Sequence, residues 1–292
     1  ENPSLTQIYH FDRWEMGGLR ALDENRRVLM TALAQKKKGE QTEDLLTLAK
    51  LNLANNRGQE TLGYLRVALI DLPELEDNAE FIALRAAAAA LAGRPDEAIE
   101  DFVKEPLKNT GELGYWKAAT LGALEDWAQA VTALPATFDV LAAYPAPIRL
   151  PLGLMLSEVA LRGGKADVAL SLLTLLDQVK DSMTPSNRAA WQYLMGEAQR
   201  QKGNKDKAEE LWSPLIKGSD DYYRAKAGLS LTKLQQEANK ITVDQTIDRL
   251  EGLRYAWRGD ELETLINYRL GQVYIENGDY LKGLSVLRNA ST

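Results

Sequence analysis

Few side chains in this 292-residue chain could carry out chemistry. It contains one histidine, His10, and no cysteine. A Ser-His-Asp or Cys-His arrangement needs a histidine held by a carboxylate, but His10 lies close to the chain end, where segments are commonly mobile. We therefore expect His10 to be exposed and catalytically inactive. A zinc site built from histidines and cysteines would have only one ligand.

Acidic pairs are the remaining candidates for acid–base catalysis. Examples are Glu209 with Glu210 and Asp220 with Asp221. Such pairs are common on solvated helices, and catalysis by paired carboxylates requires an enclosed substrate cleft. No glycine-rich phosphate-binding motif is present. The sequence therefore predicts no enzyme activity, no cofactor and no catalytic, cofactor-binding or metal-binding residue. An enzyme with an unrecognised carboxylate site is a weaker alternative.

Composition excludes further classes of function. The net charge of −7 and the pI of 5.1 disfavour nucleic acid as the main partner, because binding to phosphates needs a concentrated basic face. The dense basic run, residues 36–38, precedes Gly39, and cations are favoured at a helix C-terminus, so we expect a solvated helix end there. No window of 18 apolar residues exists. We expect no membrane insertion by this segment.

The sequence predicts helical hairpins, which must hold in place any side chains that act in function. In residues 268–280, Leu270, Gly271 and Tyr274 are three and four residues apart and so share one helix face. Asn277-Gly278 supplies a left-handed residue that ends a helix, and the following aspartate can cap the next helix. A glycine between large residues on a buried face predicts close approach of another helix.

This hairpin unit recurs along the chain. Gly196 lies seven residues before Gly203, as Gly271 lies seven before Gly278. A small residue follows each turn by five positions, and a large apolar one follows by nine. The turn positions in this frame are 58, 93, 125, 164, 203, 241 and 278. The small and large residues that follow six of them are Gly63 and Val67, Ala98 and Phe102, Ala130 and Leu134, Ala169 and Leu173, Ala208 and Trp212, and Gly283 and Leu287. The copy at 241 is degenerate, with Thr246 as its small residue.

A period in the middle thirties made of two helices is typical of a stacked helical solenoid. The pattern resembles the tetratricopeptide repeat (TPR) family, most closely in residues 264–290 and 187–214 and also in 79–105 and 153–177. The resemblance implies an all-α, right-handed superhelical α-solenoid of stacked antiparallel helix pairs, with about seven repeats. Spacings of 38 and 39 residues predict longer loops or helices than the family's usual 34.

The resemblance also implies where a ligand would bind. In such arrays the first helix of each pair lines a concave groove, and its non-packing positions contact the ligand. Transferred to this chain, the partner-binding positions are Asn52, Asn55, Tyr115, Glu158, Arg162, Tyr193, Glu197, Arg200, Gln235, Tyr268, Gln272 and Glu276. Their mixture of polar, aromatic and charged side chains suits a peptide or protein segment. The lysine-and-asparagine carboxylate clamp of some members is not reproduced.

The tryptophans divide into two groups. Trp191 and Trp212 occupy packing positions of one repeat, so we expect them in the core. Four others are less constrained by the repeat frame and are candidates for exposed anchors, which concentrate binding energy at interfaces: Trp14, Trp116, Trp127 and Trp257.

We expect four regions along the chain. Residues 1–38 form an atypical N-terminal helical segment, with a helix over 12–34 that has a weak point or a break at Gly17-Gly18 near its start. Residues 39–134 are TPR-like repeats. Residues 135–151 contain four prolines and predict a connector or kink. Residues 152–292 are further repeats, truncated at the C-terminal end because no polar capping element follows.

These features predict a non-catalytic scaffold or adaptor that binds a peptide or protein through the concave groove or an end of the solenoid, as a fragment of a larger protein. The alternative is a regulatory or targeting arm of a larger enzyme or cell-envelope assembly. Uncapped ends also allow homo-oligomerisation. The absence of cysteine and of an initiator methionine favours a periplasmic or cell-envelope location, and the cytoplasm is the alternative.

Overall fold

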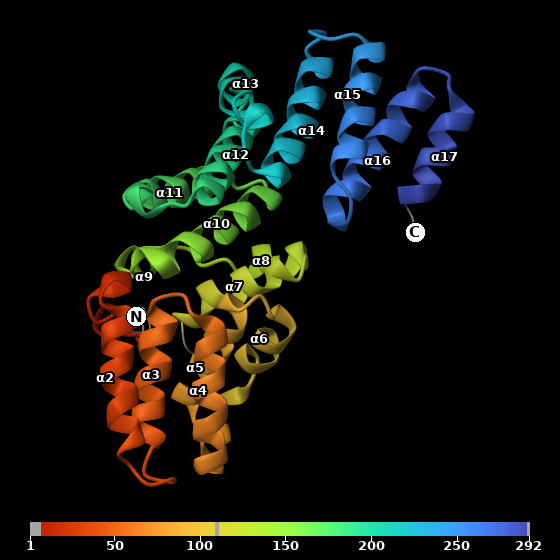
Figure 1. Ribbon diagram of the computed structural model, residues 1–292. Helices are drawn as coiled ribbons and strands as arrows, with labels where there is room; N and C mark the ends of the chain where they lie inside the picture. The colour runs from red at the N-terminus through yellow and green to blue at the C-terminus, as the bar shows by residue number, and fades with distance from the viewer. Residues whose placement is uncertain (1–6, 109–110, 291–292) are drawn as a thin grey trace. The chain divides into compact units, whose positions relative to one another are not determined.

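The computed structural model describes residues 7–108 and 111–290, and all regular secondary structure in these ranges is helical. The chain divides into two compact units, unit 1 over residues 1–183 and unit 2 over residues 184–292. Each unit is a row of helices in which neighbours in sequence are neighbours in space (Figure 1). No described helix has both the length and the apolar character that crossing a membrane requires.

The helices of unit 1 are α1 (Phe11–Trp14), α2 (Leu22–Ala34), α3 (Thr42–Ala54), α4 (Gly58–Asp71), α5 (Ala79–Leu91), α6 (Pro95–Phe102), α7 (Leu113–Ala123), α8 (Trp127–Ala133), α9 (Asp139–Ala143), α10 (Ala146–Arg162) and α11 (Ala166–Asp177). Those of unit 2 are α12 (Pro185–Gln201), α13 (Lys205–Trp212), α14 (Asp221–Glu237), α15 (Val243–Ala256), α16 (Asp260–Glu276) and α17 (Tyr280–Ala290).

These helices form pairs that stack in sequence. Unit 1 contains the pairs α3–α4, α5–α6, α7–α8 and α10–α11, and unit 2 contains α12–α13, α14–α15 and α16–α17. Within each unit, every pair also packs against the next. The prediction of an all-α solenoid of helix pairs is thereby confirmed. We call the face formed by the first helix of each pair the first-helix face.

A left-handed residue ends the first helix of all seven described pairs. Five of these residues stand where the repeat frame places them: Gly93, Glu125, Gly164, Gly203 and Gly278. The residue that follows each of them donates its backbone N–H to the carbonyl five residues before it, as Asp279 N does to Tyr274 O at 2.8 Å. This closure satisfies carbonyls that a helix C-terminus otherwise leaves without a partner.

Two turns differ from the frame by two residues. The left-handed residue is Asn56 rather than Gly58 and Asn239 rather than Ile241. Asparagine can adopt this conformation because its short polar side chain tolerates it. In the first pair the buried small and large residues are accordingly Thr61 and Leu65, and the frame's Gly63 and Val67 are exposed.

Small residues lie where two helices of a pair approach most closely. A Cβ built on Gly196 would lie 2.3 Å from Trp212 Nε1, and one on Gly283 would lie 2.9 Å from Gly271 O. Ala98, Ala169 and Ala208 at the equivalent position are fully buried. The predicted packing roles of these residues are confirmed.

The proline-rich interval 135–151 contains the short helix α9 and the start of a longer helix. It lies inside unit 1, and the helix α10 already begins at Ala146 within it. Pro147 occupies the first turn, where helix N–H groups have no intrahelical acceptor in any case. Pro151 lies in the second turn and removes one hydrogen bond near the helix start. The prolines therefore mark the beginning of a helix rather than a break before one.

Residues 11–34 contain the break near Gly17-Gly18 that the sequence indicated. The helix expected over 12–34 is split into α1 and α2 by left-handed residues Met16, Gly17 and Gly18. At the end of α2, Lys36 pairs with Asp44 at 2.6 Å. The basic run at 36–38 thus lies at a helix end, as expected, and one of its lysines links that end to α3.

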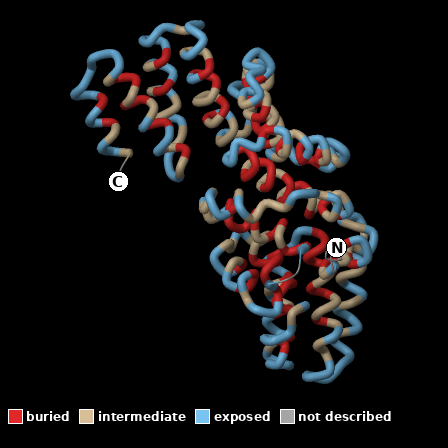
Figure 2. Tube along the Cα trace, turned by 180° about the vertical axis from the view of Figure 1, so that it is seen from behind, coloured by how far each residue is buried: buried red, intermediate tan, exposed pale blue. Residues whose placement is uncertain are grey.

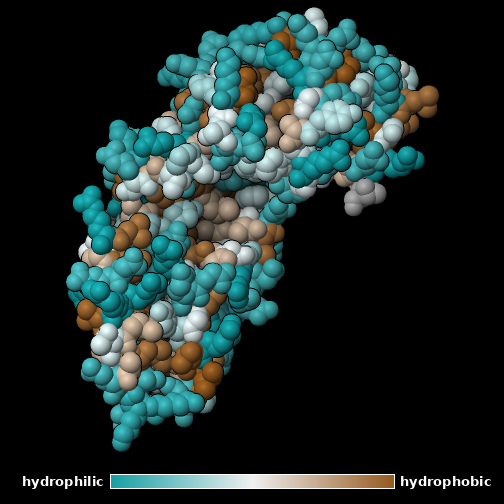
Figure 3. All heavy atoms as spheres, viewed as in Figure 1, coloured by the Kyte–Doolittle hydropathy of each residue, from teal (hydrophilic) through white to brown (hydrophobic). Residues whose placement is uncertain are grey.

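Burial follows the helix pairs. Buried residues lie on the sides of helices that face their neighbours, and exposed residues occupy the loops and outer sides (Figure 2). Hydrophilic residues cover most of the face seen in Figure 3, with hydrophobic residues in small separate groups. The last helix, α17, exposes Tyr280, Leu281 and Leu284.

Replacing Glu125 by glycine should stabilise unit 1. Glu125 has φ of +60°, and a left-handed residue with a Cβ costs roughly 1–2 kcal/mol. Part of this gain is offset because glycine has more freedom in the unfolded chain, so we expect a net rise in the free energy of unfolding of about 0.5–1 kcal/mol. Urea denaturation measures it. Gly164→Ala, at the equivalent turn, should destabilise, and equal effects of the two changes would contradict this account.

Candidate functional site

The chain itself covers the first-helix face of unit 1. Residues 7–15, which we call the N-terminal segment, run across α7, α5 and α3. Tyr9 Oη donates to Ala83 O of α5 at 2.7 Å. At the far end Lys50 of α3 lies over the Trp14 ring at 5.3 Å. The side chains of Tyr9, Phe11 and Trp14 are buried, so this segment belongs to the core of unit 1.

Glu112 is the polar centre of this arrangement. It is fully buried just before α7. Its Oε2 accepts hydrogen bonds from the backbone N–H groups of Ile8 at 2.5 Å and Tyr9 at 3.3 Å. Its Oε1 accepts from Tyr144 Oη at 2.6 Å. Burial raises the pKa of the Glu112 carboxyl, and these hydrogen bonds offset part of the rise.

Aromatic rings surround this carboxylate. Tyr9 stacks on Phe11 with ring centroids 5.2 Å apart, and both pack against Trp116. Phe11 meets Tyr144 edge to face at 4.9 Å. Trp116 Nε1 donates to Tyr144 Oη at 3.2 Å. The aromatic side chains therefore determine which sequence unit 1 can hold at this place. The hydrogen bonds to Glu112 do not, because they use backbone groups that almost any residue offers.

A second segment covers the same face beside α7. Tyr115 Oη donates to Thr137 O at 2.6 Å, and its ring packs on Phe138 at 6.1 Å. Because Tyr144 follows α9 and binds Glu112, residues 137–144 and the N-terminal segment meet at one carboxylate. Two parts of the chain therefore fill the surface where a ligand was expected.

Three predicted groove residues of unit 1 are buried, which corrects their expected role. Asn52 and Asn55 bond back to their own helix, through Nδ2 to Leu48 O and Leu51 O. Asn55 Nδ2 also lies 3.4 Å from Glu15 O of the N-terminal segment. With Tyr115 covered as well, none of the three presents its side chain to a partner.

The predicted pair on α10 is placed differently. Glu158 and Arg162 form an i,i+4 ion pair at 3.3 Å, and the Arg162 guanidinium lies 4.2 Å from the Trp127 ring centroid. Arg162 is exposed, but these contacts link α10 to α8. Trp127 is half-buried beneath it rather than projecting as an anchor.

In unit 2, the first predicted groove residue is buried and its neighbours are not. Tyr193 stacks on Trp212, and its Oη lies 2.9 Å from Ser230 Oγ of α14. Glu197 and Arg200 form an ion pair at 2.7 Å one turn further along α12. The hydrogen bond that Arg200 donates to Glu197, with the charge of Glu237 nearby, raises the pKa of Arg200.

Gln235 faces the opposite side of α14 from the one expected. It donates to Glu209 of α13 at 2.7 Å and accepts from Arg249 of α15. The next residue, Gln236, instead accepts from Arg269 Nη2 of α16 at 2.7 Å. The residue of α14 on the first-helix face is thus Gln236, because one position turns a helix by about 100°.

The predicted residues of α16 remain accessible. Tyr268 is 53% exposed and Glu276 is exposed, while Gln272 is half-buried beside Arg269. Together with Glu197 and Arg200, these residues make up the polar and aromatic part of the first-helix face of unit 2. They carry both signs of charge and no cluster that could hold a metal was found among the described residues.

Several aromatic residues near the chain start and in the helix pairs are at least half-buried. Trp14 and Trp116 are buried and cannot be exposed anchors. Trp257 is half-buried against Tyr222, with ring centroids 5.3 Å apart. His10 is half-buried and packs edge-on against Trp14 at 6.1 Å. The terminal segment is therefore ordered by packing, contrary to the expectation of an exposed histidine.

One ion-pair network stands out in unit 1. Arg85 of α5 bonds both Glu76 and Asp101 at 2.7 Å, and Lys104 bonds the same two carboxylates. The hydrogen bond from Arg85 lowers the pKa of Glu76 to about 2. Since the four charges satisfy one another, the network holds α5 to α6 and offers no acid or base at neutral pH.

Glu112→Gln should change how stability depends on pH. The pKa of Glu112 in the folded state lies above its ordinary 4.5, so between these two values the folded state binds more protons than the unfolded state. Stability then falls as pH rises through this window. We expect the stability of the wild type relative to Glu112→Gln to be greatest below pH 4.5 and to decline as pH rises through the raised pKa of Glu112.

Urea denaturation at several pH values measures this difference. Tyr9, Tyr144 and His10 also face Glu112, and comparison with the glutamine variant removes contributions common to both proteins. A difference that grows with rising pH would show that the carboxylate is stabilised rather than strained by its surroundings.

Neither a scan against protein-family models nor a search of curated protein sequences finds a match to this chain. The structure by itself shows what the arrangement can do. In unit 1, a stack of helix pairs holds residues 7–15, which include the short helix α1, by hydrogen bonds to backbone groups and by aromatic packing. A comparable face in unit 2 presents exposed polar and aromatic side chains.

Proposed function

We propose that this protein is a non-catalytic scaffold whose first-helix face in unit 2 binds a peptide segment of a partner protein. The observation that carries the proposal is the N-terminal segment, which lies across three first helices of unit 1. It is held there by a buried carboxylate and by Tyr9, Phe11 and Trp14. The same architecture in unit 2 offers Tyr268 and its neighbours without such a buried cover.

Membership of the TPR family is part of this proposal. It is supported by the turn residues at Gly203 and Gly278 and by the close contacts of Gly196 and Gly271. The family's mode of binding, with ligand on the first helices, agrees with the position of the N-terminal segment. A role as the regulatory or targeting arm of a larger assembly would use the same face.

Photocrosslinking tests the proposal. A benzophenone amino acid placed at position 268 on α16 should crosslink a partner in cells of the source organism. The matched control is position 70 on α4, because Ile70 is 67% exposed but lies on a second helix. We expect a discrete crosslinked protein at 268 that is absent at 70. The double variant Gln272→Ala with Glu276→Ala should weaken recovery of that protein.

Identical crosslinks at both positions would contradict binding at the first-helix face. Crosslinking before cell fractionation would also test the expected periplasmic or cell-envelope location, since the partner's compartment becomes known with its identity.

A further inference from the structure

Unit 2 has a recessed surface that contains only Gln235 of its predicted groove residues. It is a cleft of about 550 Å³ between α14, α15 and the residues that follow α13. The helix α13 has only eight residues, whereas α11 has 12 and α15 has 14. Ser213 and Pro214 follow its last residue, and a proline limits continuation of the helix. The cleft begins where this second helix ends, with Ser213 and Ile216 on its wall.

Small side chains keep the cleft open. A Cβ on Gly252 of α15 would meet no atom within 4 Å, and Ala225 and Ala256 line the same space. Leu231 and Leu253 supply an apolar floor. The volume lies within the range of about 300–1,000 Å³ typical of ligand pockets, so the cleft is large enough to take side chains of a ligand.

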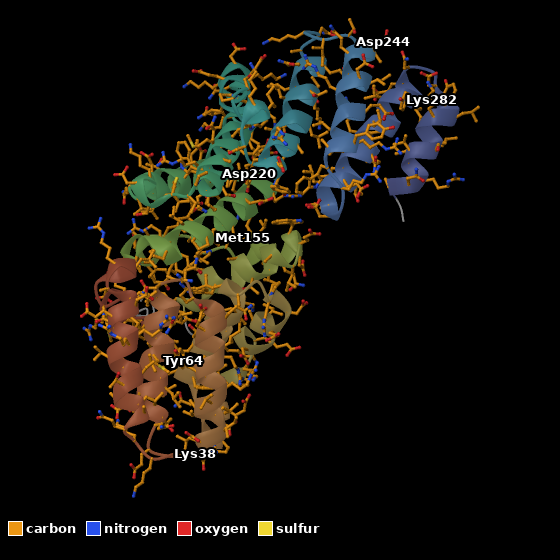
Figure 4. The ribbon with its side chains drawn as sticks, in the orientation of Figure 1. Lys38, Tyr64, Met155, Asp220, Asp244 and Lys282 are labelled. Carbon is orange, nitrogen blue, oxygen red and sulfur yellow. The ribbon has the colours of Figure 1, made fainter. Side chains whose placement is uncertain are left out.

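The cleft is long rather than round. Its lining residues on α14 run from Asp221 to Gln235, which corresponds to about 21 Å at 1.5 Å per residue. An extended chain of roughly six residues covers that length. The side chains in Figure 4 show the antiparallel arrangement, with Asp220 and Asp244 marking the N-terminal ends of α14 and α15 at opposite ends. The shape favours a peptide over a compact molecule.

One arginine at the cleft has no carboxylate partner. Arg249 donates to the neutral Gln235 Oε1, and among the described residues no ion pair to it is formed. Residues three and four positions away on α15 are not acidic. Gln235 is itself held by Glu209, which pairs with Lys240 at 2.5 Å. The guanidinium is thus positioned while its charge stays uncompensated.

Other charges at the cleft cancel. Arg224 and Asp221 both line it and form an ion pair with each other. Unit 2 as a whole has 16 basic against 15 acidic residues, whereas residues 1–183 have 19 against 27. An acidic ligand is therefore repelled by the charge of unit 1 but not by that of unit 2, and Arg249 supplies the local attraction.

We propose that this cleft binds an acidic peptide segment of a partner protein. An apolar side chain of the peptide lies on Leu231 and Leu253, and the carboxylate of a neighbouring Asp or Glu side chain pairs with Arg249. A planar guanidinium suits bidentate binding of such a carboxylate. Tyr268, Gln272 and Glu276 do not line the cleft, so this proposal and the proposed function can be tested independently.

Selection from a phage library of random octapeptides, with the full chain as bait, tests the proposal. We expect selected peptides to carry an apolar residue next to Asp or Glu. Their dissociation constants, measured by fluorescence anisotropy, should rise at least about tenfold in Arg249→Gln and in Gly252→Leu, which fills the cleft. Arg258→Gln, an exposed arginine just beyond α15 that does not line the cleft, is the matched control and should bind as the wild type does.

A double-mutant cycle locates the carboxylate. Changing the acidic peptide residue to its amide should weaken binding to the wild type and have little further effect in Arg249→Gln. Additive effects would overturn the pairing. Selected peptides that bind Gly252→Leu normally would overturn the site, and peptides that lose affinity instead in Tyr268→Ala would leave the proposed function standing without this cleft. Circular dichroism checks that each variant is folded.

Discussion

Phe11→Ala is expected to lower the free energy of unfolding of unit 1 by about 3–5 kcal/mol, the usual cost of truncating a fully buried phenylalanine. Residues this close to a chain end seldom matter for stability. Phe11 is different because its ring contacts Tyr9, Trp116 and Tyr144 at the centre of unit 1. The loss would leave a cavity between the N-terminal segment and α7.

Hydrogen exchange read by mass spectrometry assigns the effect to a unit. Amides of α5 and α7 should lose protection in Phe11→Ala, while those of α14 and α16 should not. Leu281→Ala serves as the control, since Leu281 is 88% exposed on α17 and exposed substitutions usually stay within about 0.5 kcal/mol. Unchanged protection in unit 1 would mean that the N-terminal segment is not part of its core.

Gly196→Ala is the second change with a large expected effect. A single added methyl group would lie 2.3 Å from Trp212 Nε1, which donates to Tyr193 O at 3.0 Å. The indole must move, and overpacking of a core typically costs about 1–3 kcal/mol. If the hydrogen bond is lost too, the buried Tyr193 carbonyl adds roughly 1–3 kcal/mol. Urea denaturation gives the sum.

Gly252→Ala is the matched control for Gly196→Ala. Both glycines are helical and both lie in unit 2, but a Cβ on Gly252 meets nothing. Alanine is a better helix former than glycine, so this change should stabilise by about 0.5–1 kcal/mol. If both variants were equally stable, the close helix contact at Gly196 would not exist and the repeat register would be wrong.

The architecture was predictable because its determinants are local. Gly93, Gly203 and Gly278 each end the first helix of a pair. The small residues at a fixed distance after them pack against that helix. The pattern was less exact where asparagine replaces glycine. Asn56 and Asn239 shift the turn by two residues, since a frame that searches for glycine cannot decide between neighbouring polar positions.

The candidate site was less predictable because its residues depend on distant partners. The burial of Tyr9 requires Ala83 and Glu112, which lie 74 and 103 residues further along. The run of aromatics at 9, 11 and 14 was a signal of this packing that composition alone did not reveal. Gln235 was misplaced for a different reason: a shift of one residue moves a side chain to another helix face, and Gln236 was equally polar.

The N-terminal segment has a consequence for how the protein is made. Its aromatic side chains leave the ribosome well before Tyr144, which packs on Phe11 and binds Glu112 and is synthesised 133 residues after Phe11. At about 5–20 residues per second, this separation lasts roughly 7–27 seconds. Until the end of that interval the packing around Phe11 is incomplete, because Tyr144 has not yet been made. Unit 1 therefore becomes complete only late in its own synthesis, whereas the helix pairs of unit 2 can form one after another as they emerge.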